Sequence, residues 1–125
     1  MKSLILLTVV LLSSVSFGQI RGLSFANLAG TYEATATGLP IKTTLTINVH
    51  GDITLVETSG GRSFHCTGKA RLDNGIVSSS VVCTNDARFD QRINLSNISN
   101  LRNFQAPVYS SLFGTEVLHN FRRIR

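Results

Sequence analysis

The sequence predicts an all-β protein, an eight-stranded antiparallel up-and-down barrel with one disulfide. Three observations predict it: apolar and polar residues alternate over most of the chain after residue 30, short turn signals separate the alternating runs, and the only two cysteines fall opposite each other in one hairpin. Alternation with period two is typical of strands with one buried face. Closing a meander of such strands into a barrel removes both open edges. A two-sheet sandwich is the alternative.

The cysteine hairpin runs from Phe64 to Cys83 around the dipeptide Asn74-Gly75. Asn-Gly is a strong hairpin signal, because both residues of the tight turn need positive φ. With these two residues as the loop, Cys66 lies opposite Cys83 at a non-hydrogen-bonded pair, where side chains are closest. The hairpin therefore predicts a Cys66–Cys83 disulfide.

Strands are also expected before this hairpin, at 31–37, at 41–48 and after Gly51. Gly51 suits the left-handed position of a three-residue loop, and Gly60-Gly61 suits a two-residue loop. These loops predict a common apolar face for the strands, with the pairs Ile47 and Ile53, Leu45 and Leu55, Leu55 and Cys66, and Glu57 and Phe64.

Three more strands are expected after the hairpin. A three-residue loop at Asn85-Asp86-Ala87 pairs Cys83 with Phe89, and a two-residue loop at Gly114-Thr115 pairs Ser110 with His119. Pro107 lacks a backbone donor, which predicts a bulge or a partly open edge there. The outward positions of the strands are polar, which predicts a soluble barrel, since a lipid-embedded barrel needs an apolar exterior.

The first residues have the features of a signal peptide. Lys2 precedes the apolar run Leu4 to Leu12, which is shorter than a membrane span, and small residues end at Gly18. We expect residues 1–18 to be a signal peptide and 19–125 a single barrel domain, with 19–29 as a flexible arm or a short helix plugging one end. No transmembrane segment is expected after cleavage. An exported chain with two cysteines fits a periplasmic or secreted location.

Basic residues are expected on the outer face of the fourth to sixth strands. The predicted registers place Lys69, Ser80 and Arg92 in one row, with Arg71 in the next row and Arg88 nearby. Such a stripe suits an anionic polymer or an acidic partner, although an ordinary solvated face gives the same pattern. Without signal cleavage the net charge is +5. No aromatic residues are interleaved with the basic ones, so nucleic-acid binding is not expected.

The predicted interior contains polar residues among small and apolar ones: Glu57, Gln91, Ser110, His119 and Arg123. Small interior residues favour a solidly filled barrel, and the alternative is a ligand pocket with a few polar contacts. Ser110 beside His119 suggests a nucleophile and a base, but no carboxylate is positioned to orient the histidine and no nucleophile motif surrounds the serine. We expect no catalytic site. The cysteines are expected to be paired and the histidines do not converge, so no metal or other cofactor is expected.

The segment Leu28-Ala29-Gly30-Thr31-Tyr32 resembles the start of the first strand of the calycins, a group that includes lipocalins, fatty-acid-binding proteins and avidins. Their first strand carries Gly-x-Trp, here with Tyr32 in place of the tryptophan. The resemblance implies that a basic residue of the last strand, Arg123, crosses the Tyr32 ring where the barrel closes. Ser59 to Phe64 resembles more faintly the Ser-Gly-x-x-Tyr loop of exported bacterial lysozyme inhibitors, whose cysteine pattern differs.

These observations favour an exported, non-enzymatic binding protein of the cell envelope. Its expected partner is a small apolar ligand inside the barrel or another envelope protein. Two alternatives stay open: inhibition of an exported hydrolase, a protease or a lysozyme, through loop 59–64 or arm 19–29, and a structural role in the envelope.

Overall fold

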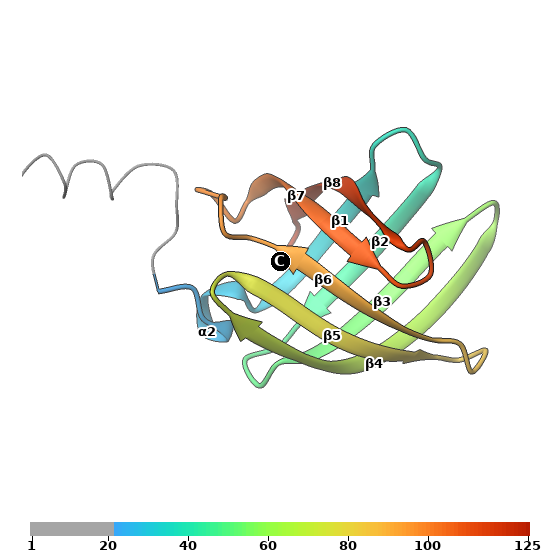
Figure 1. Cartoon of the computed structure of the whole chain (residues 1–125), viewed down its shortest axis with the longest axis horizontal. Coiled ribbons are helices and arrows are strands. Elements are labelled where there is room, and N and C mark those ends of the chain that lie inside the picture. The colour runs from blue at the N-terminus through green and yellow to red at the C-terminus, as the bar shows by residue number, and fades with distance from the viewer. Residues whose placement is uncertain (1–21) are drawn as a thin grey trace, which may run out of the picture.

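The structure is a closed antiparallel barrel whose strands follow one another in chain order, so the predicted fold is confirmed (Figure 1). The computed structural model describes residues 22–125, so the expected signal peptide at 1–18 lies outside the described residues. A short helix precedes the eight strands. The elements are α2 (Phe25–Leu28), β1 (Gly30–Ala36), β2 (Ile41–Ile47), β3 (Asp52–Ser59), β4 (Arg62–Asp73), β5 (Ile76–Cys83), β6 (Arg88–Asn94), β7 (Asn103–Ser110) and β8 (Thr115–Arg123).

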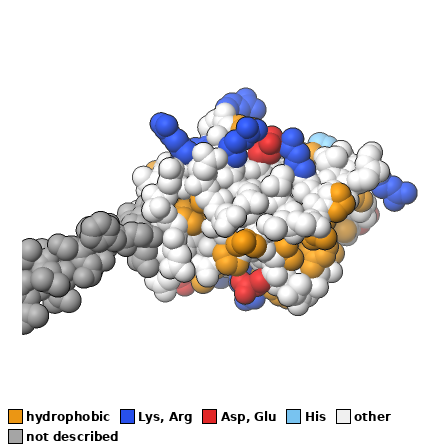
Figure 2. All heavy atoms as spheres, turned by 90° about the horizontal axis from the view of Figure 1, so that it is seen from above, with side chains coloured by type: hydrophobic (Ala, Val, Ile, Leu, Met, Phe, Trp, Pro, Cys, Tyr) orange, Lys and Arg blue, Asp and Glu red, His pale blue; other side chains and the backbone are white. Residues whose placement is uncertain are grey.

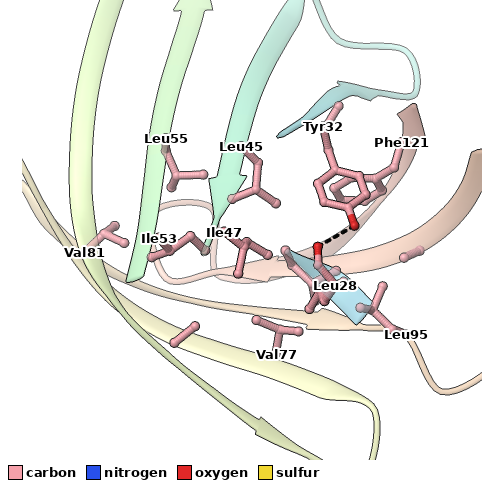
Figure 3. Packing of buried hydrophobic residues seen from close by; sticks show 14 of the residues in the cluster. Leu28, Tyr32, Leu45, Ile47, Ile53, Leu55, Val77, Val81, Leu95 and Phe121 are labelled. Atoms are coloured by element: carbon pink, nitrogen blue, oxygen red, sulfur yellow. Dashed lines mark hydrogen bonds between the residues drawn. The ribbon is translucent and has the colours of Figure 1, made fainter. Parts of the chain in front are cut away.

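Helix α2 closes one end of the barrel, which decides between the two roles expected for the segment that precedes β1. The backbone N–H of Asn27 donates to the side chain of the N-cap Ser24, which helps to start this single turn. Leu28 is buried, and its carbonyl oxygen accepts a 2.6 Å hydrogen bond from the Tyr32 hydroxyl (Figure 3). The opposite end, formed by the loops β1–β2, β3–β4, β5–β6 and β7–β8, has no such plug within the described residues.

The predicted registers of β2 to β5 are confirmed. Ile47 pairs with Ile53, Leu55 pairs with Cys66, and Cys66 pairs with Cys83 and forms the disulfide. Asn74 and Gly75 both have positive φ, as the two-residue turn requires. The registers of these four strands were predicted correctly because, in each connecting loop, the glycines that suit the left-handed conformation allow only one loop placement.

The predicted register between β5 and β6 is wrong by two residues. Val81, not Cys83, pairs with Phe89. The three-residue loop is Thr84-Asn85-Asp86, and Asp86 takes the left-handed conformation with φ 64°. The predicted loop would have put Ala87 in that position, and aspartate tolerates positive φ better than alanine.

The predicted register between β7 and β8 is wrong by four residues. Ser110 pairs with Thr115 and Ala106 pairs with His119, so Ser110 and His119 are not cross-strand neighbours. The loop is Ser111 to Gly114, in which Gly114 is the last residue and donates its N–H to the Ser110 carbonyl oxygen at 2.9 Å. Both register errors are even numbers of residues, so the predicted inward faces are unchanged.

The barrel closes where β1 pairs with β8. Tyr32 pairs with Arg123, and the guanidinium carbon of Arg123 lies 5.6 Å from the centre of the Tyr32 ring, as the calycin resemblance implies. Gly30 permits this arrangement: a Cβ there would lie 2.9 Å from Arg123 Nε and 2.5 Å from the Arg125 carbonyl oxygen. The closure thus depends on a glycine beside the aromatic residue.

The weakest contact in the barrel is between β6 and β7. Only three residue pairs join them, from Gln91 with Ser110 to Ile93 with Val108. The ladder ends next to Pro107, which confirms the partly open edge expected there. Separately, within residues 22–125, no helix has both the length and the apolar character needed to cross a membrane.

Candidate functional site

The interior of the barrel is filled in one half and hollow in the other. Beside α2, the core contains the largest fully buried side chains, Leu28, Tyr32, Ile53, Val77 and Val81. In Figure 3, Tyr32 and Phe121 lie next to Leu28, with Ile47, Ile53 and Val77 around them. Both interior arrangements left open by the sequence are therefore present, each in its own half.

The hollow half is a narrow cavity that opens at the end opposite α2. The space that the centre of a water-sized sphere can occupy inside it is about 50 Å³, so the cavity is narrow. Leu45, Leu55, Ile93 and Phe121 belong to the buried core and also line the cavity, so they form its floor. Ala34 and Ala36 of β1 line its side. The small side chains of these alanines leave space that larger residues would fill.

Most of the lining is apolar, and among it lie polar side chains predicted to face inward, of which four were singled out from the sequence. They are Glu57 of β3, Gln91 of β6, Ser110 of β7 and His119 of β8. Within the described residues, the side chains of Glu57 and Gln91 form no hydrogen bond, although Gln91 is only 7% exposed. Glu57 is half-buried, and the polar side-chain atoms of both residues keep some exposed surface, so water or a ligand can reach them. Their hydrogen-bonding capacity is therefore free for water or a ligand inside the cavity.

The other two polar groups are partly engaged. Ser110 Oγ accepts a 3.3 Å hydrogen bond from the backbone N–H of Leu112, which leaves its hydroxyl proton free to donate. His119 Nδ1 lies 2.9 Å from the carbonyl oxygen of Val117. A carbonyl oxygen only accepts, so Nδ1 donates, and Nε2 is an acceptor when the ring is neutral. The cavity thus presents the Glu57 carboxylate as a purely accepting group, while Gln91 and Ser110 can both donate and accept.

Glu57 is the only carboxylate that lines the cavity within residues 22–125. Burial raises the pKa of its carboxyl group, and the nearby His119 opposes this only in part. No ion pair to Glu57 occurs among the described residues. The folded protein therefore holds this carboxylate at a cost in stability.

We predict that Glu57→Gln stabilises the protein in a pH-dependent way. A carboxyl group whose pKa is raised by folding contributes stability below its unfolded pKa, near 4.5, and that stability is lost as the pH rises through the folded pKa. The two proteins should therefore have similar free energies of unfolding below about pH 4.5 and diverge above it, with the variant more stable. Urea denaturation across this pH range measures the difference. The exposed Glu116→Gln is the matched control, and a difference that stays constant with pH would contradict the prediction.

Arg123 does not belong to this cavity, contrary to its assignment among the interior ligand residues. Its guanidinium donates to the carbonyl oxygens of Ala29 and Asn27, at the end closed by α2. Tyr32 lies beneath it. The alternation of the strand placed Arg123 on the inward face correctly but could not show at which end it lies. Its contacts are those of a residue that closes the barrel.

The rim of the cavity contains exposed apolar residues that the sequence did not assign to a site. Leu39 of the β1–β2 loop and Phe113 of the β7–β8 loop line the mouth and are 43% and 50% exposed. Leu112 and Leu118, both exposed, belong to the same part of the chain as Phe113. Figure 2 shows hydrophobic side chains gathered toward this end of the molecule. The sequence signal was the pair Leu112-Phe113 directly before Gly114, which the predicted register placed inside a strand.

The predicted basic surface is interrupted. Lys69, Arg71, Arg88 and Arg92 are all exposed, as expected. The shift between β5 and β6 puts Asp90, not Arg92, in the row of Lys69 and Ser80. Lys69 also forms a 2.8 Å ion pair with Asp52, and Arg92 lies over the Tyr109 ring at 4.5 Å. The positive charge is therefore divided, and no continuous stripe results.

The part of the chain that the structure describes contains no cluster of three histidine, cysteine, aspartate or glutamate side chains suited to a metal ion. The cavity is a site at which apolar surface and polar groups without hydrogen-bond partners meet. In comparisons with known proteins, no family model matches the chain, and no curated sequence or solved structure is significantly similar to it.

Proposed function

We propose that this protein is an exported, non-enzymatic binding protein that holds a small, largely apolar ligand in the open half of its barrel. The observation that carries the proposal is the cavity itself, which has an apolar floor and walls, several polar groups without partners and an open mouth. Ligand sites combine a mostly apolar lining with a few polar groups that orient the ligand. A barrel built only for stability would have a filled interior and paired polar groups.

A calycin-like relationship is part of this proposal. The closed barrel of eight strands and the arginine over the aromatic ring of β1 are consistent with it. Binding of apolar molecules inside the barrel is what the resemblance implies. Export to the periplasm or the medium is likewise proposed, and the disulfide is compatible with an oxidising compartment.

No observation favours the two alternatives over ligand binding. The loop 59–64, considered for hydrolase inhibition, is a tight turn at Gly60 and Gly61 between two long strands. Part of the arm 19–29 forms α2 and packs against the core. Binding of a partner protein, hydrolase inhibition and a structural envelope role stay predictions from the sequence.

The proposal predicts that a neutral amphiphile binds in the cavity and that filling the cavity prevents it. Decanol, titrated into the isotope-labelled protein, should bind the wild type with saturating chemical-shift changes. Ala36→Leu places a larger side chain in the cavity and should weaken binding at least about tenfold, since several methylene contacts are lost. Thr35→Leu adds a larger apolar side chain to the exposed face of the same strand and is the matched control.

Two results would contradict the proposal. One is the absence of saturable binding to the wild type. The other is equal loss of affinity in Ala36→Leu and Thr35→Leu, which would show that the cavity is not where decanol binds. Circular dichroism of both variants establishes that they fold.

A further inference from the structure

The charges inside the cavity are unbalanced. Glu57 contributes a carboxylate to the lining, and within residues 22–125 no lysine or arginine lines the cavity. Arg123, the arginine that the alternation of β8 places on the inward face, lies at the end of the barrel closed by α2. There its guanidinium donates hydrogen bonds to the carbonyl oxygens of Ala29 and Asn27. Among the described residues, the only other titratable group in the lining is His119.

This imbalance disfavours an anionic ligand. A ligand carboxylate in the cavity would lie near Glu57 with no lysine or arginine to offset it, and like charges in a poorly solvated site repel strongly. When the His119 ring is neutral, Nδ1 donates to the Val117 carbonyl oxygen and Nε2 is an acceptor. The cavity is therefore poorly suited to fatty acids, although its apolar lining suits their hydrocarbon chains.

A ligand that donates hydrogen bonds fits the same groups well. The Glu57 carboxylate, the Gln91 side-chain carbonyl and His119 Nε2 are acceptors without a described partner. A protonated amine is a multiple donor that also neutralises a carboxylate. It would pair with the half-buried carboxylate, which forms no ion pair among the described residues.

The position of Glu57 fixes the orientation of such a ligand. On β3, Leu55 belongs to the apolar floor, and Glu57 follows two residues nearer the β3–β4 turn at the open end. Ser110, the last residue of β7, lies at the same open end. A hydrocarbon chain directed at the floor would leave its polar end at the level of Glu57.

We propose that the ligand of this cavity is a slender amphiphile with an amine, which enters chain first and places its ammonium group against Glu57. The inference rests on the proposed function, because it names the chemical class of the ligand for the same cavity. It assigns Glu57 as the residue that determines specificity by charge. Gln91 and His119 are further acceptors beside it, through the amide oxygen and through Nε2 of the neutral ring.

The test compares three ligands with the same chain: decylamine, decanol and decanoate. Isothermal titration calorimetry at neutral pH, below the micelle-forming concentrations, measures their affinities for the wild type and for Glu57→Gln. We expect the wild type to bind decylamine at least about tenfold more tightly than decanoate, because hydrogen bonds to charged groups are the stronger ones. In Glu57→Gln, decylamine should bind no better than decanol. Glu116→Gln, which removes an exposed carboxylate from β8, should bind all three like the wild type.

The outcomes separate this inference from the proposed function. If decanoate binds the wild type as tightly as decylamine, or if Glu57→Gln keeps the preference for the amine, the assignment of an amine ligand is wrong while ligand binding stands. If Glu116→Gln loses the preference as fully as Glu57→Gln, the preference arises from overall charge and the assignment is also wrong. If none of the three ligands binds the wild type, the proposed function itself fails.

Discussion

Deletion of Phe121 to Arg125 is expected to abolish cooperative folding of the whole domain. Phe121 is buried, stacks on Phe104 with ring centres 4.7 Å apart and pairs with Ala34 across the seam. The backbone of Thr31 forms hydrogen bonds with both Ile124 and Arg125. Loss of a buried phenylalanine side chain alone costs about 3–5 kcal/mol, a large part of the about 5–15 kcal/mol by which domains are stable. Removal of the seam adds unpaired edges on β1 and β7.

Urea denaturation followed by circular dichroism measures this effect. The truncated chain should show no cooperative transition, or one at a far lower midpoint. Leu118→Ala is the control, because Leu118 lies on the same strand but is exposed, and it should change the midpoint little. A truncated chain that unfolds like the complete one would contradict the closure between β1 and β8.

Replacement of both cysteines by alanine is expected to destabilise the protein by about 2–5 kcal/mol. The disulfide joins residues 17 positions apart, on the adjacent strands β4 and β5, at the end of the hairpin away from its Asn74-Gly75 turn. Cross-linking a loop of this size restricts the unfolded chain, which gives an estimate of about 3 kcal/mol. Because both cysteines are also buried, the alanines lose some packing.

The disulfide prediction is checked by urea midpoints of the wild type and of Cys66→Ala/Cys83→Ala, each with and without reductant. Reduction should lower the midpoint of the wild type and leave that of the double variant unchanged. Intact-mass analysis of the oxidised wild type after alkylation should detect no free thiol. Two alkylated cysteines in the unreduced protein would contradict both the disulfide and the register of the β4–β5 hairpin.

The sequence predicted the strands and their inward faces because alternation depends on nothing beyond the residues themselves. Loop registers were predictable where one residue alone suited the left-handed position, as with Gly51 and Gly75. They failed where two placements kept the same alternation, as with Asp86 against Ala87 and with Gly114 as first or last residue of its loop. On the strands that these two loops connect, the side chains still face inward or outward as expected, because both register errors are even numbers of residues.

The polar members of the candidate site were also predictable, but the cavity was not. Glu57, Gln91, Ser110 and His119 follow from alternation alone, and all four line the cavity. Whether they surround free space depends on how the volumes of residues from all eight strands add up, and on α2 filling only one end. The pattern of residues along one strand does not reveal the total volume of the side chains that fill the barrel. The assignment of Arg123 failed for the same reason, since alternation gives the face of a strand but not the layer of the barrel.

The most direct test of the central claim is to locate a bound amphiphile by nuclear Overhauser effects in the decanol titration. The account predicts contacts between the methylene protons of decanol and the methyl groups of Leu45, Leu55 and Ile93, the aliphatic residues of the cavity floor. These contacts should disappear in Ala36→Leu and persist in Thr35→Leu. Contacts confined to the exposed rim residues Leu112 and Leu118, with none to the floor, would show that the ligand adheres to the outside and would contradict the account.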